Sequence, residues 1–309
     1  MKEIEINGND SGQRLDKFLT KYMPNLPGSM LYKGLRKNCV RINGKHEKNP
    51  STILKNGDVL SLYFKDEFFE KALDFSPVKY NFDIAYEDDN ILVINKAPGI
   101  SVHSEDKSNA VTLIDMVKSY LYEKKEYLPE NEHSFSPAFC SRLDKNTGGL
   151  ITCAKNSVSL RELNEQIRLH NVKKYYTCIA EGKFEKKHDI LKDFLTRGNK
   201  SVTVSATGDK EIITEYEVIK EFEQHSLVKI TLHTGRTHQI RAHLAYYGHP
   251  LAGDKKYGSV IPVKFRYQAL YCTGLTFDFD KNVSTLKYLT GKSISIDISK
   301  TDLNERNLK

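Results

Sequence analysis

A stretch of nine residues at positions 141–149 concentrates the residue types that could do chemistry. It reads Ser-Arg-Leu-Asp-Lys-Asn-Thr-Gly-Gly and lies between the apolar runs 137–140 and 150–154. This pattern predicts a strand, a polar loop and a second strand, which together hold Asp144 on a rigid scaffold. The paired glycines permit backbone angles closed to other residues, so we expect them to leave space beside the carboxylate for a flat substrate. A hairpin turn with a solvated aspartate is the competing interpretation.

A second cluster, at positions 234–244, reads Thr-Gly-Arg-Thr-His-Gln-Ile-Arg-Ala-His-Leu. The apolar spacing over 240–247 predicts a helix closed by Gly248, with Arg236 and His238 flanking its N-terminus. A helix start with free N–H groups and an arginine attracts phosphate. The competing interpretation is a helix cap with a solvated arginine and one histidine in the core.

A third segment, 173–180, begins with two lysines and two tyrosines and predicts a strand that carries Tyr176 near its start. The sequence has no phosphate-binding glycine loop of the Walker kind and no dinucleotide fingerprint. Nucleotide hydrolysis and hydride transfer are therefore not indicated, and we expect no cofactor. A lone carboxylate beside a phenol and a cation, Asp144 with Tyr176 and Arg241, suits a cofactor-free rearrangement of a nucleotide.

The histidines and cysteines do not predict a metal site. His233, His238, His243 and His249 are spaced by five, five and six residues, which does not place two of them one turn apart on a helix face. The five cysteines are scattered without a Cys-x-x-Cys pair, and several lie in apolar runs. We therefore expect reduced, structural thiols.

The charge of the chain points to a polyanionic partner. The 309 residues include 47 Lys and Arg against 40 Asp and Glu, with a sequence pI near 8.9, and residues 1–64 alone hold eleven basic and six acidic side chains. This length suits about two domains. The first residues form no apolar signal region and no run approaches membrane-spanning length, so we expect a cytoplasmic protein without membrane contact.

Local patterns divide the chain into a small N-terminal part and a larger part that carries the candidate residues. The expected N-terminal elements are a helix over 15–19, a second helix over 31–37, a β-hairpin over 40–45 with an Asn-Gly turn, and a turn and strand over 55–63. The predicted divisions are a basic module at 1–64, a linker at 65–80, a catalytic domain at 81–300 and a polar C-terminal tail at 301–309.

The larger part mixes strands and helices. Its expected elements are a strand at 91–94, a turn with Gly99 at positive φ, a helix over 114–121 behind a Thr112/Asp115 capping box, a helix over 160–167 behind a Ser159/Glu162 cap, a polar hairpin-like region between 182 and 210, and strands over 212–218 and 227–232. Strands joined by short turns predict an α+β fold, with a mixed, largely antiparallel sheet and flanking helices.

The N-terminal part resembles an S4-type RNA-binding domain over about residues 12–64. The segment 14–19, the hairpin 40–45 and Asn56-Gly57-Asp58 carry the resemblance. It implies a small α/β fold that binds RNA. The candidate contacts are the basic side chains Arg14, Lys17, Arg36, Lys37, Arg41 and Lys45. A small basic domain that only packs on its neighbour is the competing interpretation.

The segments 142–150, 174–176 and 234–241 resemble the three active-site motifs of the RluA-type pseudouridine synthases, and 253–258 and 95–99 fit as well. The similarity spans about residues 82–280. With the S4-type domain in front, the chain is similar to the large-subunit ribosomal RNA branch. The resemblance implies the pseudouridine synthase fold and the isomerisation of uridine to pseudouridine in RNA.

The resemblance also implies roles for single residues. Asp144 takes the place of the catalytic aspartate, which attacks the target uridine or assists cleavage of its glycosidic bond, so that the base rotates and rejoins through carbon 5. Tyr176 matches the tyrosine that stacks on the base and is a candidate for proton transfer. Arg241 matches the basic residue that pairs with the aspartate and orients it. Arg142 matches the side chain that fills the gap left by the flipped uridine.

Three positions depart from the family pattern. Ser141 stands where the family usually has histidine, Gly148 stands where it usually has serine, and Ala97-Pro98 reverses the common order. None of them is a proposed catalytic residue. They bear on the finer contacts around the flipped nucleotide, including the position of Arg142.

The expected partner is RNA, with ribosomal RNA as the first candidate and transfer RNA as an alternative, and no protein partner is indicated. Arg236 and His238 complete the expected RNA contacts of the larger part. A second hypothesis is a non-catalytic RNA-binding factor of ribosome assembly that keeps the fold. The basic N-terminal module and the departures beside Asp144 motivate it.

Overall fold

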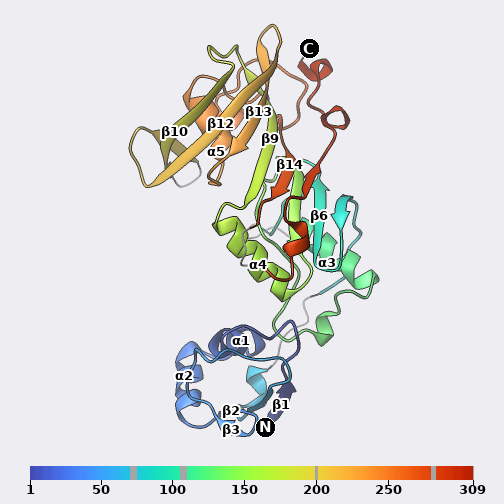
Figure 1. The fold of residues 1–309 in the computed structure, drawn as a ribbon, viewed down its shortest axis with the longest axis vertical. Helices are drawn as coiled ribbons and strands as arrows, with labels where there is room; N and C mark the ends of the chain where they lie inside the picture. Colours follow the sequence, from blue (N-terminus) through green and yellow to red (C-terminus); the bar gives the residue numbers. More distant parts are fainter. Residues whose placement is uncertain (70–74, 105–109, 199–200, 280–282, 309) are drawn as a thin grey trace.

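The structure is a computed structural model that describes residues 1–69, 75–104, 110–198, 201–279 and 283–308. It forms a small N-terminal unit and a larger sheet-based unit, which lie end to end along the long axis of the molecule (Figure 1). In the described part of the chain, no helix combines the length and the apolar character needed to cross a bilayer.

The N-terminal unit packs two helices on a small antiparallel sheet with strand order β1-β4-β2-β3. Its elements are β1 (Lys2–Glu5), α1 (Leu15–Tyr22), α2 (Gly28–Arg36), β2 (Val40–Ile42), β3 (Lys45–His46) and β4 (Val59–Leu62). The predicted helices and the Asn-Gly hairpin are confirmed, and Asn43 and Gly44 both take positive φ in that turn. The first strand was not predicted, because its four residues carry a single buried side chain, Ile4.

The core of this unit is built by the helices' apolar faces. Phe18, Leu19 and Leu35 from the helices, with Leu60 and Leu62 from β4, have at most 1% of their surface exposed. Burial of each such side chain stabilises the fold by about 1.5–3 kcal/mol. Phe68 and Phe69, from the predicted linker, pack against the same core.

The larger unit is one continuous sheet with strand order β11-β10-β12-β13-β9-β14-β8-β6-β5, to which β15 adds at β14 and β7 at β8. All these pairs are antiparallel except β14 with β8, so the predicted mixed, largely antiparallel sheet is confirmed. The strands are β5 (Asp83–Glu87), β6 (Ile91–Lys96), β7 (Ala138–Phe139), β8 (Gly148–Ala154), β9 (Val172–Glu181), β10 (His188–Arg197), β11 (Val202–Ser205), β12 (Lys210–Glu221), β13 (His225–Leu232), β14 (Leu270–Phe277) and β15 (Ser293–Ser295).

Three helices flank this sheet: α3 (Leu113–Glu123), α4 (Ser157–Arg168) and α5 (Gln239–Tyr246). The capping box of α3 is confirmed, since Thr112 and Asp115 bond reciprocally. The cap predicted at Ser159 is wrong. The helix α4 begins at Ser157, three residues before the predicted start, and its N-cap is Asn156, whose side chain accepts from the Ser159 N–H. Asparagine is as good a cap as serine, so the apolar period alone placed the start too late.

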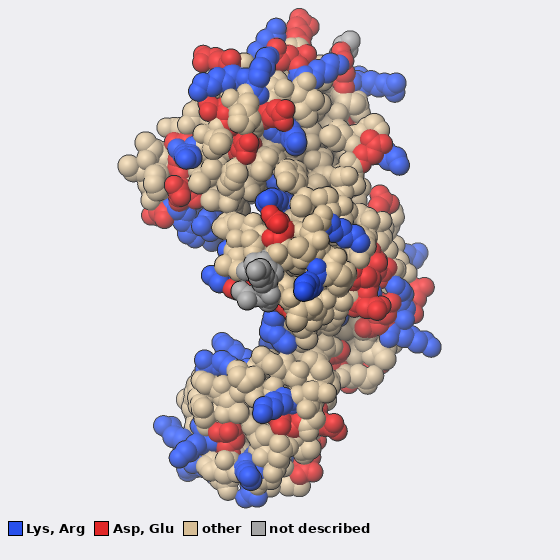
Figure 2. Space-filling model, in the orientation of Figure 1, with Lys and Arg blue, Asp and Glu red and all other residues tan. Residues whose placement is uncertain are grey.

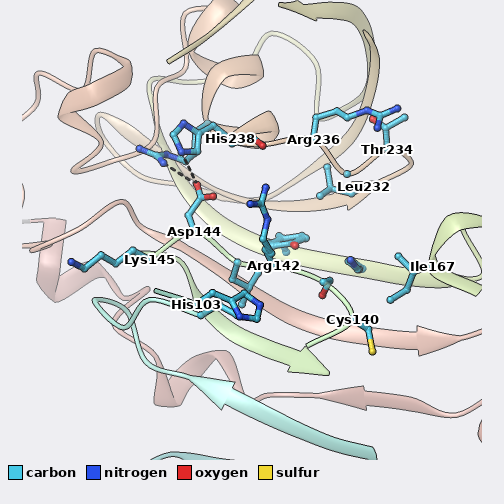
Figure 3. A pocket seen from close by; sticks show the side chains of 18 of the residues that line it. His103, Cys140, Arg142, Asp144, Lys145, Ile167, Leu232, Thr234, Arg236 and His238 are labelled. Carbon is cyan, nitrogen blue, oxygen red and sulfur yellow. Dashed lines mark hydrogen bonds and ion pairs between the residues drawn. The ribbon is translucent and has the colours of Figure 1, made fainter. Parts of the chain in front are cut away.

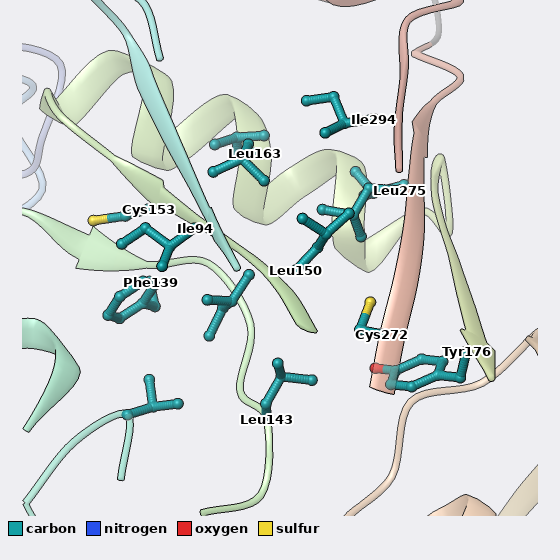
Figure 4. Packing of buried hydrophobic residues seen from close by; sticks show 14 of the residues in the cluster. Ile94, Phe139, Leu143, Leu150, Cys153, Leu163, Tyr176, Cys272, Leu275 and Ile294 are labelled. Atoms are coloured by element: carbon teal, nitrogen blue, oxygen red, sulfur yellow. The ribbon is translucent and has the colours of Figure 1, made fainter. Parts of the chain in front are cut away.

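The main core lies between α4 and the central strands. Figure 4 shows Leu163 of α4 facing Leu150, Ile94 and Leu275 of the sheet. Each of these four side chains is at most 3% exposed. The region between 182 and 210, predicted as a polar hairpin, contains the ten-residue strand β10 and the short β11, and its alternating Val202 and Val204 are buried against α5.

A polar contact joins the two units. The Asn9 amide donates to Glu132 (2.8 Å), and the Asn9 side-chain oxygen accepts from the Ser157 N–H at the start of α4 (3.1 Å). Ser134 donates to Asp10 (2.6 Å) and accepts from Gln13 (2.7 Å). The first residue of α4 and the loop around 129–134 therefore hold the N-terminal unit, in addition to the covalent connection.

The predicted linker and tail both carry packed side chains. Residues 70–74 of the linker lie outside the described residues, and Phe75 packs on Tyr122 and Tyr127 of the larger unit. In the predicted tail 301–309, Leu303 is buried at 5% exposure beside Phe265. These last residues therefore cover the sheet rather than trail away from it.

Candidate active site

The loop that carries Asp144 is held by its backbone. It connects β7 to β8, which pair as a hairpin, and the Thr147 N–H donates to the Asp144 carbonyl (3.0 Å). The Lys145 carbonyl accepts twice, from the Gly99 N–H (2.9 Å) and from the Lys96 ammonium (2.9 Å). Gly99 takes φ of +92°, as predicted for its turn. The 95–99 segment thus pins the loop next to the carboxylate.

Lys96 was not predicted as a site residue. It has no exposed surface and donates from one nitrogen to three carbonyls, those of Ala97, Ile100 and Lys145 (3.1, 3.0 and 2.9 Å). Burial lowers the pKa of Lys96 to about 8, against the opposing charge of Asp144. The sequence signal was its place in the 95–99 motif, but only the folded chain brings Lys145 to it.

A buried arginine faces the Asp144 carboxylate. Arg241 donates from Nη1 to Asp144 Oδ2 (2.9 Å), and from Nε and Nη2 to the two carboxylate oxygens of Asp254 (2.7 and 2.9 Å). The Asp254 side chain is 2% exposed. Because this two-point contact fixes the plane of the guanidinium, the remaining nitrogen is aimed at Asp144. Asp254 lies in the recognised 253–258 motif, but the sequence did not indicate its role.

Arg241 and His238 both face the Asp144 carboxylate. Burial by itself would lower the pKa of Arg241, but the hydrogen bonds and charges of Asp254 and Asp144 raise it above its ordinary value. His238 Nε2 lies 3.7 Å from Asp144 Oδ2. Burial lowers the pKa of His238, partly offset by Asp144, so its ring is neutral near pH 7. The permanent countercharge to Asp144 is therefore Arg241.

His238 begins α5 in an unusual backbone conformation. It is the N-cap, with φ of +55°, and its Nδ1 lies 2.7 Å from the Tyr257 hydroxyl. Gln239 closes the preceding turn, since its side-chain oxygen accepts from the Arg236 N–H (3.0 Å) and the Thr234 hydroxyl (2.9 Å). His238 is therefore fixed in the pocket wall next to Asp144, whereas the Arg236 side chain is exposed at the rim.

A buried polar network supports α5 from behind. His243 has no exposed surface, and its Nε2 lies 3.0 Å from Asp193, which also accepts from the Tyr247 hydroxyl (2.7 Å). Its Nδ1 lies 2.9 Å from the hydroxyl of Thr214. Burial lowers the pKa of His243, so the ring is neutral and donates to the carboxylate. His243 is the core histidine of the competing interpretation, and it anchors the helix that carries Arg241.

Tyr176 lies on β9 at 7% exposure, in the wall of the same pocket. Burial raises the pKa of Tyr176 well above its ordinary value, with Cys272 and Asp144 contributing. Its phenol is therefore neutral at physiological pH. Cys140 also lines the pocket, but burial raises the pKa of its thiol to about 12, so it is not a nucleophile there.

These residues surround a cavity of about 910 Å³ (Figure 3). The side chains of Arg142 and Asp144 point into it side by side, while Lys145 turns away. A recess of about 70 Å³ adjoins it, and Asp144 and Tyr176 border this recess together with apolar Leu143 and Leu270. The structure therefore brings Asp144, Tyr176, Arg241, Arg142, Arg236 and His238 to one cavity.

The expectation for the two glycines is confirmed in one part and wrong in the other: Gly149 takes a backbone angle closed to other residues, but the glycines leave no space beside the carboxylate. Gly148 and Gly149 begin β8, where they pair in parallel with Tyr271 and Cys272 of β14. A side chain at Gly148 would overlap the Tyr271 ring, and one at Gly149, which has φ of +100°, would overlap the Cys272 backbone. The glycines thus let two strands approach closely and make no space for a substrate. Gly148, which departs from the family pattern, does not line the cavity.

The basic side chains of the N-terminal unit lie outside this cavity. Lys17, Arg36, Lys37 and Lys45 are exposed. Arg14 is paired with Asp16 (2.8 Å). The guanidinium of Arg41 lies over the Tyr63 ring at 5.4 Å from its centre.

The described residues contain no group of three or more His, Cys, Asp or Glu side chains arranged to hold a metal ion. All five cysteines are free.

Comparison with known proteins places this site in a family. The sequence profile of RNA pseudouridylate synthases matches residues 90–246, and that of S4 domains matches residues 13–60. The chain belongs to the RNA pseudouridylate synthase family. It is therefore an isomerase that converts uridine in RNA to pseudouridine, and the RluA-type and S4-type resemblances are confirmed.

Two curated relatives match most of the chain. Ribosomal large subunit pseudouridine synthase C of Haemophilus influenzae is 32% identical over an aligned length of 305, and the match covers 93% of this chain and 90% of the relative. Ribosomal large subunit pseudouridine synthase D of Blochmanniella floridana is 33% identical over an aligned length of 261, and the match covers 83% of this chain and 79% of the relative. The structure of human RNA pseudouridylate synthase domain containing 1 has the same fold, with a TM-score of 0.54 at 21% identity over 67% of this chain and 83% of that one.

Proposed function

We propose that this RNA pseudouridylate synthase modifies uridines of large-subunit ribosomal RNA, with Asp144, Tyr176 and Arg241 as the residues of the reaction. The relatives from Haemophilus influenzae and Blochmanniella floridana, named for that RNA, support the substrate. The S4-type unit with its exposed basic side chains supports a structured RNA partner.

The isomerisation breaks the bond between N1 of the uracil and C1′ of the ribose, and forms a bond between C5 and C1′. The proton on C5 is then lost and N1 gains one, so no oxidant or reductant is consumed. Asp144 acts on the target nucleotide as an ionised carboxylate, whether it attacks directly or assists cleavage of the glycosidic bond. Arg241 stabilises the negative charge of Asp144 and orients its carboxylate, since Arg241 Nη1 donates to Asp144 Oδ2 at 2.9 Å.

The recess beside Asp144 fits the role of a base-holding site. Its wall combines the flat, neutral phenol of Tyr176 with the buried Leu143 (8% exposed) and Leu270 (4%). A uracil ring stacks on an aromatic face and excludes water from the carboxylate. Tyr176 in this position is also the group proposed to take part in the transfer of the C5 proton.

Entry into this recess requires that the uridine leave its stack, because Asp144 lies inside a cavity. Arg142, exposed at the mouth beside Asp144, is placed to occupy the gap that the flipped base leaves in the RNA. Figure 2 shows Lys and Arg side chains on both sides of the notch between the two units. RNA held across this notch contacts the S4-type unit and the catalytic unit together.

The observation that carries the proposal is the Asp144–Arg241–Asp254 arrangement at a cavity that also contains Tyr176. A site-resolved map of pseudouridine in total RNA, with and without the gene for this chain, tests it. We expect one or more positions of large-subunit ribosomal RNA to lose pseudouridine and to regain it on complementation. Loss confined to transfer RNA would redirect the substrate, and an unchanged map would refute the proposed function.

A further inference from the structure

Lys174 is a pocket residue to which the reaction described above assigns nothing. It lies on β9 two residues before Tyr176, and Val172, Lys174 and Tyr176 all line the cavity, as the two-residue period of a strand requires. Two residues along a strand correspond to about 7 Å. Lys174 therefore lies beside Tyr176 along the pocket wall. The distance between them is comparable to that between an RNA base and the sugar-phosphate backbone next to it.

The surroundings of Lys174 are apolar. Across the two neighbouring strands it pairs with Leu232 of β13 and Leu275 of β14. The thiols of Cys140 and Cys272 act electrostatically on its amine, but burial raises the pKa of both to about 12, so neither supplies an anion at neutral pH. Burial also lowers the pKa of Lys174 below its ordinary value.

Within the described residues, no hydrogen bond or ion pair satisfies this amine. Two other cations of the cavity wall are paired: Arg168 is held by both oxygens of Glu165 (2.6 and 2.8 Å), and Arg241 is held by two carboxylates. Asp144 is the acidic side chain among the described residues that line the cavity, and Arg241 already contacts it. Lys174 lines the cavity as a half-buried side chain and no protein anion compensates its charge there, so an anionic group of the ligand can pair with it.

Resting on the proposed function, we propose that the Lys174 ammonium binds a phosphate of the RNA backbone next to the flipped uridine. Phosphate is the anionic group of RNA, and lysine binds it as a point charge. The base itself offers only neutral acceptors, which would leave the charge uncompensated. Lys174 is thus a substrate-positioning residue that holds the strand while Tyr176 and Asp144 engage the nucleotide.

The neighbouring Lys173 provides a matched control. It is exposed on the opposite face of β9, and its amine is paired with Asp278 at 2.7 Å. Lys173→Met and Lys174→Met remove the same charge one residue apart, from outside and inside the cavity. Since methionine suits the apolar surroundings of Lys174, we expect Lys174→Met to fold with an unchanged or higher melting temperature.

RNA binding is measured over a range of salt concentrations with the Asp144→Asn chain, on a ribosomal RNA fragment that carries the modified uridine. Adding Lys174→Met is expected to weaken binding about tenfold and to flatten the slope of log affinity against log salt by about 0.7, the value of one phosphate contact. Lys174→Arg restores the slope. Lys173→Met changes neither the slope nor the affinity by a comparable amount.

Turnover separates this inference from the proposed function. With Asp144 intact, Lys174→Met is expected to raise KM and to leave kcat within a few-fold of wild type. A wild-type chain without activity on any RNA would refute the proposed function. An active wild type with a Lys174→Met slope equal to that of Lys173→Met, or with a loss confined to kcat, would overturn the phosphate contact.

Discussion

The basic side chains of the N-terminal unit and those of the catalytic pocket are organised in opposite ways. Lys17, Arg36 and Lys37 are exposed; the first two lie on short helices and Lys37 directly follows α2. Arg241 has a side chain that is 8% exposed and is held by three hydrogen bonds to two carboxylates. Exposed charges act nearly independently and are screened by salt, whereas buried ones act only as a set. We therefore expect the first arrangement to provide RNA affinity, whereas the second holds a fixed geometry.

The sharpest test of this difference is Asp144→Asn. Asparagine keeps the size of the side chain but removes the charge that faces Arg241, so we expect activity to fall by roughly 10⁴-fold or more. RNA affinity should remain within a few-fold, because the phosphate contacts lie elsewhere. Tritium release from RNA labelled at C5 of uridine measures the first, and filter binding the second. A parallel loss of both would mean that the two regions are not separable.

The second test removes the arginine. Arg241→Met leaves Asp254 buried at 2% exposure without its partner, so the free energy of unfolding should fall by about 3–5 kcal/mol, and activity should be lost with it. Adding Asp254→Asn removes the uncompensated charge, and we expect stability to recover while activity stays absent. Urea unfolding and tritium release of both variants check this. Activity recovered in the double variant would contradict the role of Arg241 as the partner of Asp144.

The third test uses the lowered pKa of Lys96. Its folded pKa of about 8 lies below the value of 10.5 for an ordinary lysine, so between these two pH values the unfolded chain binds a proton that the folded chain has lost. Stability then rises with pH across that window by about 3 kcal/mol in total, and below it the cost of the buried charge is fully present. Lys96→Met lacks this rise. The free energy of unfolding of wild type and of Lys96→Met is measured with urea across this pH range. If both changed with pH in the same way, the burial of a titrating lysine would be refuted.

The smallest effect is expected in the N-terminal unit. The combined variant Lys17→Gln, Arg36→Gln and Lys37→Gln should leave kcat and the melting temperature unchanged, since all three side chains are exposed. The slope of log affinity against log salt should flatten by about 2, the value of three phosphate contacts. Salt titrations of RNA binding provide the measurement. An unchanged slope would support the interpretation that this unit only packs on its neighbour.

The sequence by itself located the candidate residues of the reaction and determined roughly where the elements lie. Asp144, Tyr176 and Arg241 stand in short motifs whose order along the chain was readable, and the apolar periods located the helices and most strands. Local signals of this kind depend on neighbours a few residues away. Where a local signal was ambiguous, as at the start of α4, the boundary moved by three residues.

Only the tertiary structure decided how those residues are held. Asp254 lies 13 positions from Arg241, and Lys145 lies 49 positions from Lys96, yet each pair is in direct contact. At position 148 the Tyr271 ring leaves no room for a side chain, and Tyr271 lies on β14, a strand far along the chain that pairs with β8 in parallel. Such contacts arise because the sheet brings distant segments together and excludes water between them. Neither the composition nor the spacing of residues shows which distant segments pack together. The partners of Lys96, Arg241 and the two glycines are therefore known only from the folded structure.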